Sequence, residues 1–321
     1  MQTIESARRQ GNDKAVDSAA ERRRRRIARF RRFGLMNGCG PEVVIERATS
    51  IQDLAAAYSL VHQVFHDERS YITPQQGGMR LRVFEALPEM ATFVAKIDGQ
   101  VIAVTSLVPD SPDLGLPSDQ AFGRELGQLR ASGRLVAEVT NLAVDPMYRN
   151  TPVFFDLTRC CFAQAEACGY DDLFVAISPE HGAFFEHVLL FEPCGDRRSY
   201  SDKILDIVEG KRLDLHNIEQ RAIDTDALLG PEAFLHDFYF SGNRFHRYVK
   251  VWPKQAARLF SAAHLLRELF VKRTGFLARC TPDELEAIRR RWGSVLDQVL
   301  AGDAPPALAE AADVAMAIPG A

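Results

Sequence analysis

One apolar stretch of the sequence carries an acidic side chain near its middle. Between residues 134 and 150 the chain reads RLVAEVTNLAVDPMYRN, which predicts a buried strand that contains Glu138. A buried carboxylate is costly unless another group pairs with it or it has a chemical task. Because side chains alternate along a strand, Thr140 should share the face of Glu138. Two interpretations stay open: an ion pair with an arginine elsewhere, or a general base whose proton affinity is raised by burial.

Two further groups could take part in chemistry near this strand. Arg149 precedes a helix whose first amide groups would suit a phosphate. The segment SPEHGAFFEHVLL predicts a helix that begins at Ser178, with His181 in its first turn. A helix N-terminus disfavours the charged imidazolium, so a neutral His181 could accept or donate one proton; a histidine packed in the core is the alternative. His62 and His66 lack a third ligand, so we expect no metal site.

The bulk composition is that of a soluble globular protein with a charged N-terminal segment. The 321 residues carry a net charge of −4, and 46% are hydrophobic. Residues 1–33 hold eleven Arg or Lys against four acidic residues, so the rest of the chain is acidic. The six cysteines show no paired spacing, which indicates reduced thiols in the cytoplasm. No apolar run could span a bilayer, and no nucleic-acid-binding motif is present.

The elements that would position these groups form a mixed α/β pattern. We expect a mixed α/β domain over residues 41–215, with two strands joined by a hairpin at Asp98-Gly99. Residues 216–302 predict a helical extension, in which Thr281 and Glu284 form a capping box. Residues 303–321 and the basic segment 1–40 are expected to be disordered.

The basic segment has three readings. It could be a solvated charge run, or a short amphipathic helix, because Ile27, Phe30 and Phe33 are spaced three apart. It could also contact an acidic surface, either anionic lipid at the inner face of a membrane or an acidic carrier protein. Nucleic acid is not expected as a partner, because the body of the chain is acidic.

The order of these elements resembles the GNAT acyltransferase fold. It consists of a strand, a helix, a hairpin, EVTNLAVDPMYR, a helix, LFVAIS and HGAFFEHVLLFEP. The resemblance implies a mixed central sheet flanked by helices, with an acyl thioester bound where the fourth strand separates from the fifth. Two departures weigh against free coenzyme A as donor. No glycine follows Arg149 in the expected pyrophosphate loop, and Phe184 or Phe185 stands where acetyltransferases often place a proton-donating tyrosine.

A narrower resemblance covers Glu42 to about Leu215. YSLVHQVFHDERSYITPQQGGMR, the SLVPDSPDLGLP block, AEVTNLAVDPMYR and ISPEHGAFFEHVLLFEP are similar to the N-acyl amino acid synthases (FeeM-like), relatives of the acyl-homoserine-lactone synthases. The family implies an acyl donor on acyl carrier protein and the amine of an amino acid as acceptor. The lactone synthases carry Glu-x-Ser-Arg on the fourth strand, which reads EVTN here. The missing arginine weighs against S-adenosylmethionine as substrate.

The resemblance assigns a role to each candidate residue. Glu138 is the expected base that deprotonates the acceptor, and His181 relays the proton or positions the acceptor's carboxyl group. We expect three sets of site residues: catalytic Glu138, His181 and Thr140; donor-binding Leu142, Ala143, Val144 and Arg149; and acceptor-binding Arg80 and Asn141. No bound cofactor or metal is expected, and acyl-phosphopantetheine or acyl-CoA serves as co-substrate. The alternatives are an acetyl-CoA-dependent acetyltransferase and a GNAT-like module that only binds a partner.

Overall fold

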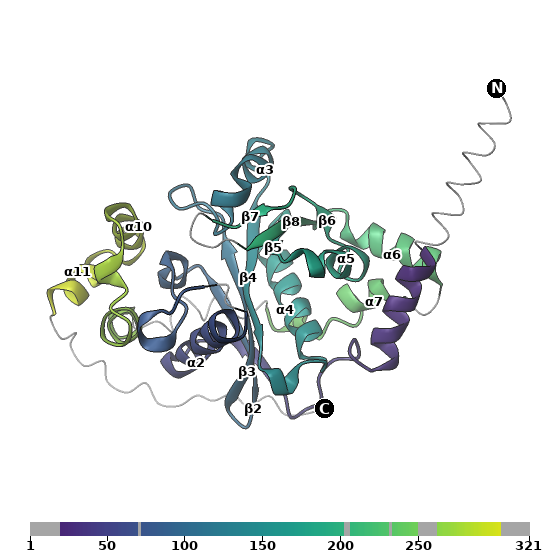
Figure 1. Cartoon of the computed structure of the whole chain (residues 1–321), viewed down its shortest axis with the longest axis horizontal. Coiled ribbons are helices and arrows are strands. Elements are labelled where there is room, and N and C mark those ends of the chain that lie inside the picture. The colour runs from purple at the N-terminus through teal and green to yellow at the C-terminus, as the bar shows by residue number, and fades with distance from the viewer. Residues whose placement is uncertain (1–19, 70–71, 202–205, 231–232, 250–261, 303–321) are drawn as a thin grey trace. The chain divides into compact units, whose positions relative to one another are not determined.

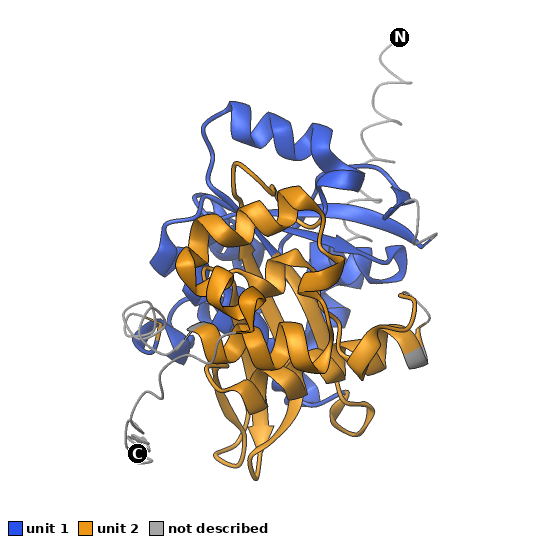
Figure 2. Cartoon of the chain, turned by 90° about the vertical axis from the view of Figure 1, so that its left-hand side faces the viewer, with its two compact units in different colours: residues 1–38, 118–138, 150–248 blue, residues 39–117, 139–149, 249–321 orange. Residues whose placement is uncertain are grey.

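The computed structural model describes residues 20–69, 72–201, 206–230, 233–249 and 262–302 (Figure 1). The chain divides into two compact units. Unit 1 comprises residues 1–38, 118–138 and 150–248, and unit 2 comprises residues 39–117, 139–149 and 249–321 (Figure 2). Residues 1–19 and 303–321, which were expected to be disordered, lie outside the described residues.

Unit 2 is built on antiparallel strands covered by helices. Its strands are β1 (Val44–Arg47), β2 (Ala91–Ile97), β3 (Gln100–Pro109) and the second half of β4 (Val136–Val144). The expected hairpin is confirmed: Ile97 pairs with Gln100, and Asp98 and Gly99 both have positive φ, as the tight turn requires. Helix α2 (Ile51–His62) packs against β3 through its buried face. The other helices are η1 (Gln63–Glu68), η2 (Gln76–Gly78), η3 (Val83–Ala86), η4 (Pro146–Tyr148), α9 (Ala262–Leu265), η6 (Leu266–Arg273), η7 (Leu277–Arg279), α10 (Pro282–Trp292) and α11 (Ser294–Ala301).

Unit 1 contains the first half of β4 and the remaining strands. These are β5 (Asp172–Ile177), β6 (Glu192–Pro193), β7 (Arg198–Ser199) and β8 (Ile207–Asp214). Its helices are α3 (Asp119–Ala131), α4 (Val153–Cys168), α5 (Pro179–His187), α6 (Ile218–Leu229), α7 (Leu235–Tyr239) and η5 (Arg244–Arg247), together with a helix over 20–32. Buried aromatic rings of α4 and α7 form much of its core: Phe155 meets Phe238, and Phe162 meets Tyr239.

Strand β4 passes from one unit to the other between Glu138 and Val139. The strand order is β1-β2-β3-β4-β5-β8-β6, with β7 paired to β8. The β4–β5 pair is parallel and its register covers Val136 to Glu138, whereas β5 and β8 are antiparallel. The mixed α/β sheet expected from the sequence is thus present, and residue 138 lies where the parallel register ends.

The basic segment differs from the disordered arm expected over residues 1–40. Its described part forms a helix over 20–32, which is the amphipathic alternative that the sequence left open. The reason is burial: Ile27 is only 1% exposed, and the Phe30 ring packs edge-on against Phe155 and Phe184. Phe33, the third residue of the expected stripe, is 66% exposed. The division into units also differs from the expected boundaries at 41, 215 and 302, which stay predictions.

The helices of the described residues are all too short or too polar to cross a bilayer. The buried hydrophobic residues of the described part form the cores of the two units.

Candidate functional site

Glu138 is buried and hydrogen-bonded at the end of the parallel register in unit 1. Glu138 is only 2% exposed. The backbone N–H of Ser118 donates to Oε2 over 2.9 Å, and the Ser118 hydroxyl donates to Oε1 over 2.8 Å. Hydrogen bonds to an ionised acceptor are strong, so Ser118 offsets part of the cost of burying this carboxylate. Ser118, fully buried just before α3, is a residue that the sequence analysis did not select.

Asn141 has an unusual backbone conformation for a strand residue. Its φ is +55°, in the left-handed region that asparagine adopts more readily than most residues. Asn141 is 1% exposed, whereas Thr140 is half-buried. Because Glu138 is buried and Thr140 is only half-buried, their position on one face of the strand stays a prediction.

The Asn141 side chain lies at the middle of a set of buried polar groups in unit 2. Its Oδ1 accepts hydrogen bonds from Arg80 and, over 3.4 Å, from Arg82. Its Nδ2 donates to Glu85 Oε1 over 3.0 Å and to Ser106 Oγ over 3.3 Å. We call these five residues (Arg80, Arg82, Glu85, Ser106 and Asn141) the buried polar centre. The two expected acceptor-binding residues, Arg80 and Asn141, are thus brought into direct contact.

Glu85 is the counter-charge of this centre. Its side chain is fully buried, and Arg82 Nη2 donates to its Oε1 over 2.7 Å. Burial alone would raise the pKa of Glu85, but the charges of Arg82 and Arg80 and the bonds from Arg82 and Asn141 hold it below its usual value. With Glu85 ionised, two guanidinium groups face one carboxylate. Guanidinium groups held in this way are suited to bind an anionic ligand group.

The segment that carries Arg80, Arg82 and Glu85 is fastened by the C-terminal helices of the same unit. Trp292 Nε1 of α10 donates to the carbonyl oxygen of Ala86 in η3 over 2.7 Å. Arg279 donates to Gln76 over 3.1 Å, and Arg291 is bonded to Glu89. At Gly77, where φ is +78°, an added Cβ would lie 2.5 Å from the carbonyl oxygen of Arg273, so the two segments meet closely.

The other predicted residues lie in less enclosed places. His181 is half-exposed in the first turn of α5, 3.4 Å from Glu180, so the alternative of a core histidine is wrong. The contacts of the described residues do not join it to Glu138. Arg149 is exposed after η4, and its role as a phosphate ligand stays a prediction. Of the expected donor strip on β4, Ala143 is buried, and Leu142 and Val144 are half-buried.

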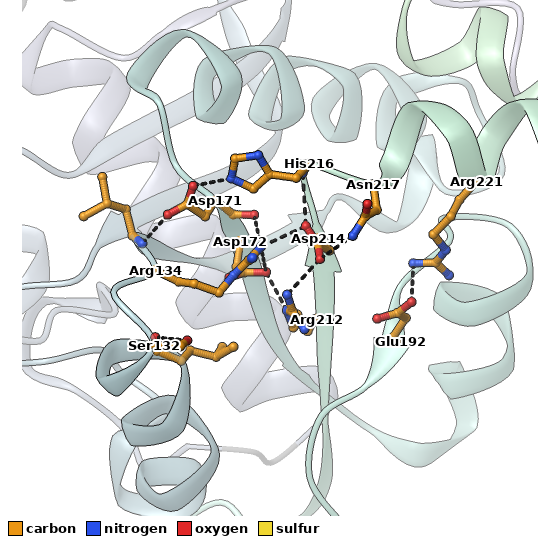
Figure 3. Close-up of polar contacts among 12 residues, drawn as sticks. Ser132, Arg134, Asp171, Asp172, Glu192, Arg212, Asp214, His216, Asn217 and Arg221 are labelled. Atoms are coloured by element: carbon orange, nitrogen blue, oxygen red, sulfur yellow. Dashed lines mark hydrogen bonds and ion pairs between the residues drawn. The ribbon is translucent and has the colours of Figure 1, made fainter.

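A charged network fixes the strand ends of unit 1 (Figure 3). The side chain of Asp172, at the start of β5, is fully buried and pairs with Arg134 and Arg212. Arg134 also donates to Asp214 of β8 over 2.8 Å. Because Arg134 lies two residues before the start of β4, this network anchors the chain four residues before Glu138. Its charges are matched within the network, so we interpret it as structural.

The described residues contain no group of three or more histidine, cysteine or acidic side chains arranged to hold a metal ion. His62 and His66 stack on one another, and His62 accepts a hydrogen bond from the backbone of Gln75 over 3.1 Å.

Part of the chain is similar to a known protein family. Residues 56–206 match the family model described as N-acyl amino acid synthase FeeM. Over these residues, which we call the FeeM-family segment, the chain is similar to that family. The FeeM-family segment contains all the residues selected from the sequence, as well as Ser118 and the whole buried polar centre. It ends before α6 and begins after β1, so neither the basic helix nor the C-terminal helices lie within it. Comparison with curated protein sequences gives no match.

Solved structures similar to this chain belong to related acyltransferases. FeeM from uncultured soil microbes is 20% identical, with a TM-score of 0.48 over 56% of this chain and 93% of that chain. The CoA-dependent acyl-homoserine lactone synthase BjaI, solved with SAM and isopentyl-CoA, is 14% identical, with a TM-score of 0.41 over 60% and 90%. An N-acetyltransferase from Staphylococcus aureus Mu50 is 19% identical, with a TM-score of 0.40 over 54% and 98%.

The mixed central sheet flanked by helices that was expected from the sequence is confirmed, and the family model that residues 56–206 match describes an N-acyl amino acid synthase. Four buried or partly buried polar residues of the site were not selected from the sequence: Arg82, Glu85, Ser106 and Ser118. The signal for Glu85 was available: it is an acidic residue inside the apolar run VFEAL, as Glu138 is inside VAEVT. Ser118 gave no comparable signal, because a serine after a proline is common in loops.

Proposed function

We propose that this FeeM-family enzyme transfers an acyl group from an acyl carrier protein thioester to the amine of an amino acid. The observation that carries the proposal is the buried polar centre. An amino acid acceptor differs from a simple amine by its carboxylate, and a carboxylate is bound best by a guanidinium that is already held in place. Arg80 is 6% exposed and is held by a hydrogen bond to Asn141.

The proposed reaction begins with loss of a proton from the acceptor's ammonium group, since only the free amine attacks a thioester. Glu138 accepts this proton directly or through one water, with His181 as the second candidate. The nitrogen then forms a bond to the thioester carbonyl carbon, and the resulting oxyanion needs hydrogen-bond donors. Backbone N–H groups of residues 142–144 are the proposed donors. The C–S bond breaks, and the thiolate of the phosphopantetheine arm takes up a proton.

Each remaining residue has a proposed task in binding. Arg149 meets the phosphate of the prosthetic arm, and Leu142, Ala143 and Val144 line the path of its thioester. Thr140 helps to orient the acceptor amine beside Glu138. We place the enzyme in the cytoplasm, which suits its free cysteines. The alternative of a peripheral position at the inner membrane face is tested below.

The donor is tested by comparing three thioesters at equal concentration. Purified protein is incubated with a long-chain acyl carrier thioester, the matching acyl-CoA and acetyl-CoA, each with a mixture of amino acids, and thiol release is followed. We expect the carrier thioester to react fastest, and Glu138→Gln to slow it by about a hundredfold. Glu219→Gln, an exposed change on α6, serves as the control. A preference for acetyl-CoA would replace the proposal by an acetyltransferase, and absence of thiol release from all three would leave a binding module.

A further inference from the structure

The basic helix over 20–32 has no role in the proposed chemistry. It lies outside the FeeM-family segment, beside α6 and α7 of unit 1 (Figure 1). Within 20–33 the only acidic residue is Glu21, which pairs with Arg24 and Arg25. The helix is therefore a concentrated positive charge on a chain whose remainder is acidic.

The inner face of this helix is fixed to the body of unit 1. Ile27 and Phe30 pack inward, as described above, and Arg23 Nε donates to the carbonyl oxygen of His187 over 2.7 Å. Arg31 stacks on the Phe234 ring at 3.9 Å from its centre. These contacts come from α4, α5 and the residue that precedes α7. The orientation of the helix is set by them, and so is the direction in which its other face points.

The outer face carries a stripe of arginines beside a groove. Arg22, Arg25, Arg29 and Arg32 are exposed and spaced three, four and three residues apart, which places them on one side of a helix. A groove of about 680 Å³ runs along the helix. Its lining consists of Glu21, Arg24, Arg25, Ala28, Arg29 and Arg32 on one side, and Leu229 and Gly230 at the end of α6 on the other. Leu228, next to this wall, is 66% exposed.

We propose that this groove docks an acidic helix of the acyl carrier protein that brings the acyl group. The inference rests on the proposed function and adds to it the surface that recognises the donor's protein part. Four guanidinium groups line the groove, so the occupant must be anionic. The groove is concave and has apolar points at Ala28 and Leu229, so it fits a convex helix with acidic and apolar side chains better than a flat bilayer. The acidic body of the chain would repel nucleic acid.

The test removes three of the four positive charges of the stripe and leaves the residues of the packed face unchanged. The variant R25Q/R29Q/R32Q is compared with R124Q/K272Q/R290Q, which removes three exposed charges elsewhere. Thermal unfolding checks that both remain folded. Binding of the holo-carrier protein is measured by fluorescence anisotropy, and turnover is measured with the carrier thioester and with the same acyl group on free pantetheine.

We expect the stripe variant to raise Kd and KM for the carrier about tenfold or more, and the control to change them less than twofold. The KM for the acyl-pantetheine should stay the same in all three proteins. Equal carrier binding by the wild type and the stripe variant would overturn the docking proposal, whatever the turnover. Carrier binding that depends on the stripe, without turnover of either thioester, would support the docking surface and overturn the proposed function.

Two other occupants are separated in the same series. Vesicles with 30% anionic lipid are tested by sedimentation, and the oligomeric state is measured by light scattering. Loss of vesicle binding in the stripe variant with unchanged carrier binding would assign the groove to a membrane and overturn the proposal. Dissociation of a dimer in the stripe variant, again with unchanged carrier binding, would assign it to a second copy of the chain.

Discussion

At the scale of single residues, β4 holds two buried polar groups in different surroundings. Glu138 receives both of its described hydrogen bonds from one serine, whereas Asn141 connects two arginines and a glutamate. The first arrangement holds a buried carboxylate with two hydrogen bonds. The second keeps guanidinium groups in place in advance of a ligand. Glu138 and Asn141 are only three residues apart in the sequence, yet their surroundings differ.

Replacing Arg80 tests the assignment of the acceptor's carboxylate. We expect Arg80→Gln to raise the KM for the amino acid acceptor about tenfold or more, because one charge-assisted contact with the carboxylate is lost. The KM for the acyl donor should change less than twofold, which steady-state kinetics with each substrate varied in turn will check. Arg124→Gln, an exposed change on α3, is the control. A rise in the donor KM alone would contradict the assignment.

Glu85 links the stability of the polar centre to pH. Its pKa is lowered in the folded chain, chiefly by Arg82 acting against burial, so the folded state binds this proton less readily than the unfolded state. The resulting stabilisation is fully present above the unfolded pKa of about 4.3 and is lost as the pH falls through the lower folded value.

The variant Glu85→Gln should therefore lose about 3 kcal/mol of unfolding free energy at pH 7, because Arg80 and Arg82 lose their counter-charge. The difference from the wild type should shrink as the pH falls below the unfolded pKa and through the lower folded pKa of Glu85, because the wild-type side chain then also becomes neutral. Urea unfolding at a series of pH values measures both. A difference that is constant with pH would mean that Glu85 acts only through packing.

At the scale of elements, the C-terminal helices support the segment that carries three residues of the polar centre. The Trp292 indole bonded to Ala86, the Arg279 contact and the close approach at Gly77 come from three different helices. Since η3 presents Glu85 to Asn141, a shift of η3 would be felt at the acceptor site.

Removing the indole donor tests this support. Trp292→Phe keeps an aromatic ring on α10 but leaves the Ala86 carbonyl oxygen without that bond, and we expect a loss of about 1 kcal/mol in stability. The KM for the acceptor should rise several-fold, while the KM for the donor stays unchanged. Leu300→Ala, at an exposed position of α11, is the control. An unchanged acceptor KM would show that α10 contributes stability alone.

The elements were largely predictable because their signals are local. The Asp98-Gly99 turn and the Thr281–Glu284 capping box depend on neighbouring residues, and both are present. The left-handed backbone at Asn141 was not predictable from alternation, because its cause is a set of partners 35 to 61 residues away. Ser118 was missed for the same reason: its bond to Glu138 joins residues 20 apart.

At the scale of the whole molecule, the FeeM-family segment is extended at both ends by helices of different character. The N-terminal helix adds a basic outer face to unit 1, and the C-terminal helices add a buried support to unit 2. The sequence revealed both extensions through charge and helical pattern. From the sequence we expected the basic residues to form a disordered arm. A charge run alone does not show that Ile27 is buried or that Phe30 packs against Phe155 and Phe184.

Taken as a whole, the chain should make an N-acyl amino acid in the cell. Mass spectrometry of lipid extracts from cells that overproduce the protein tests this most directly, since one product mass names the acyl group and the amino acid together. We predict a new acyl amide that is absent from cells overproducing the Glu138→Gln variant at equal level. Extracts without any new acyl amide, alongside acetylated small amines in the soluble fraction, would contradict the account.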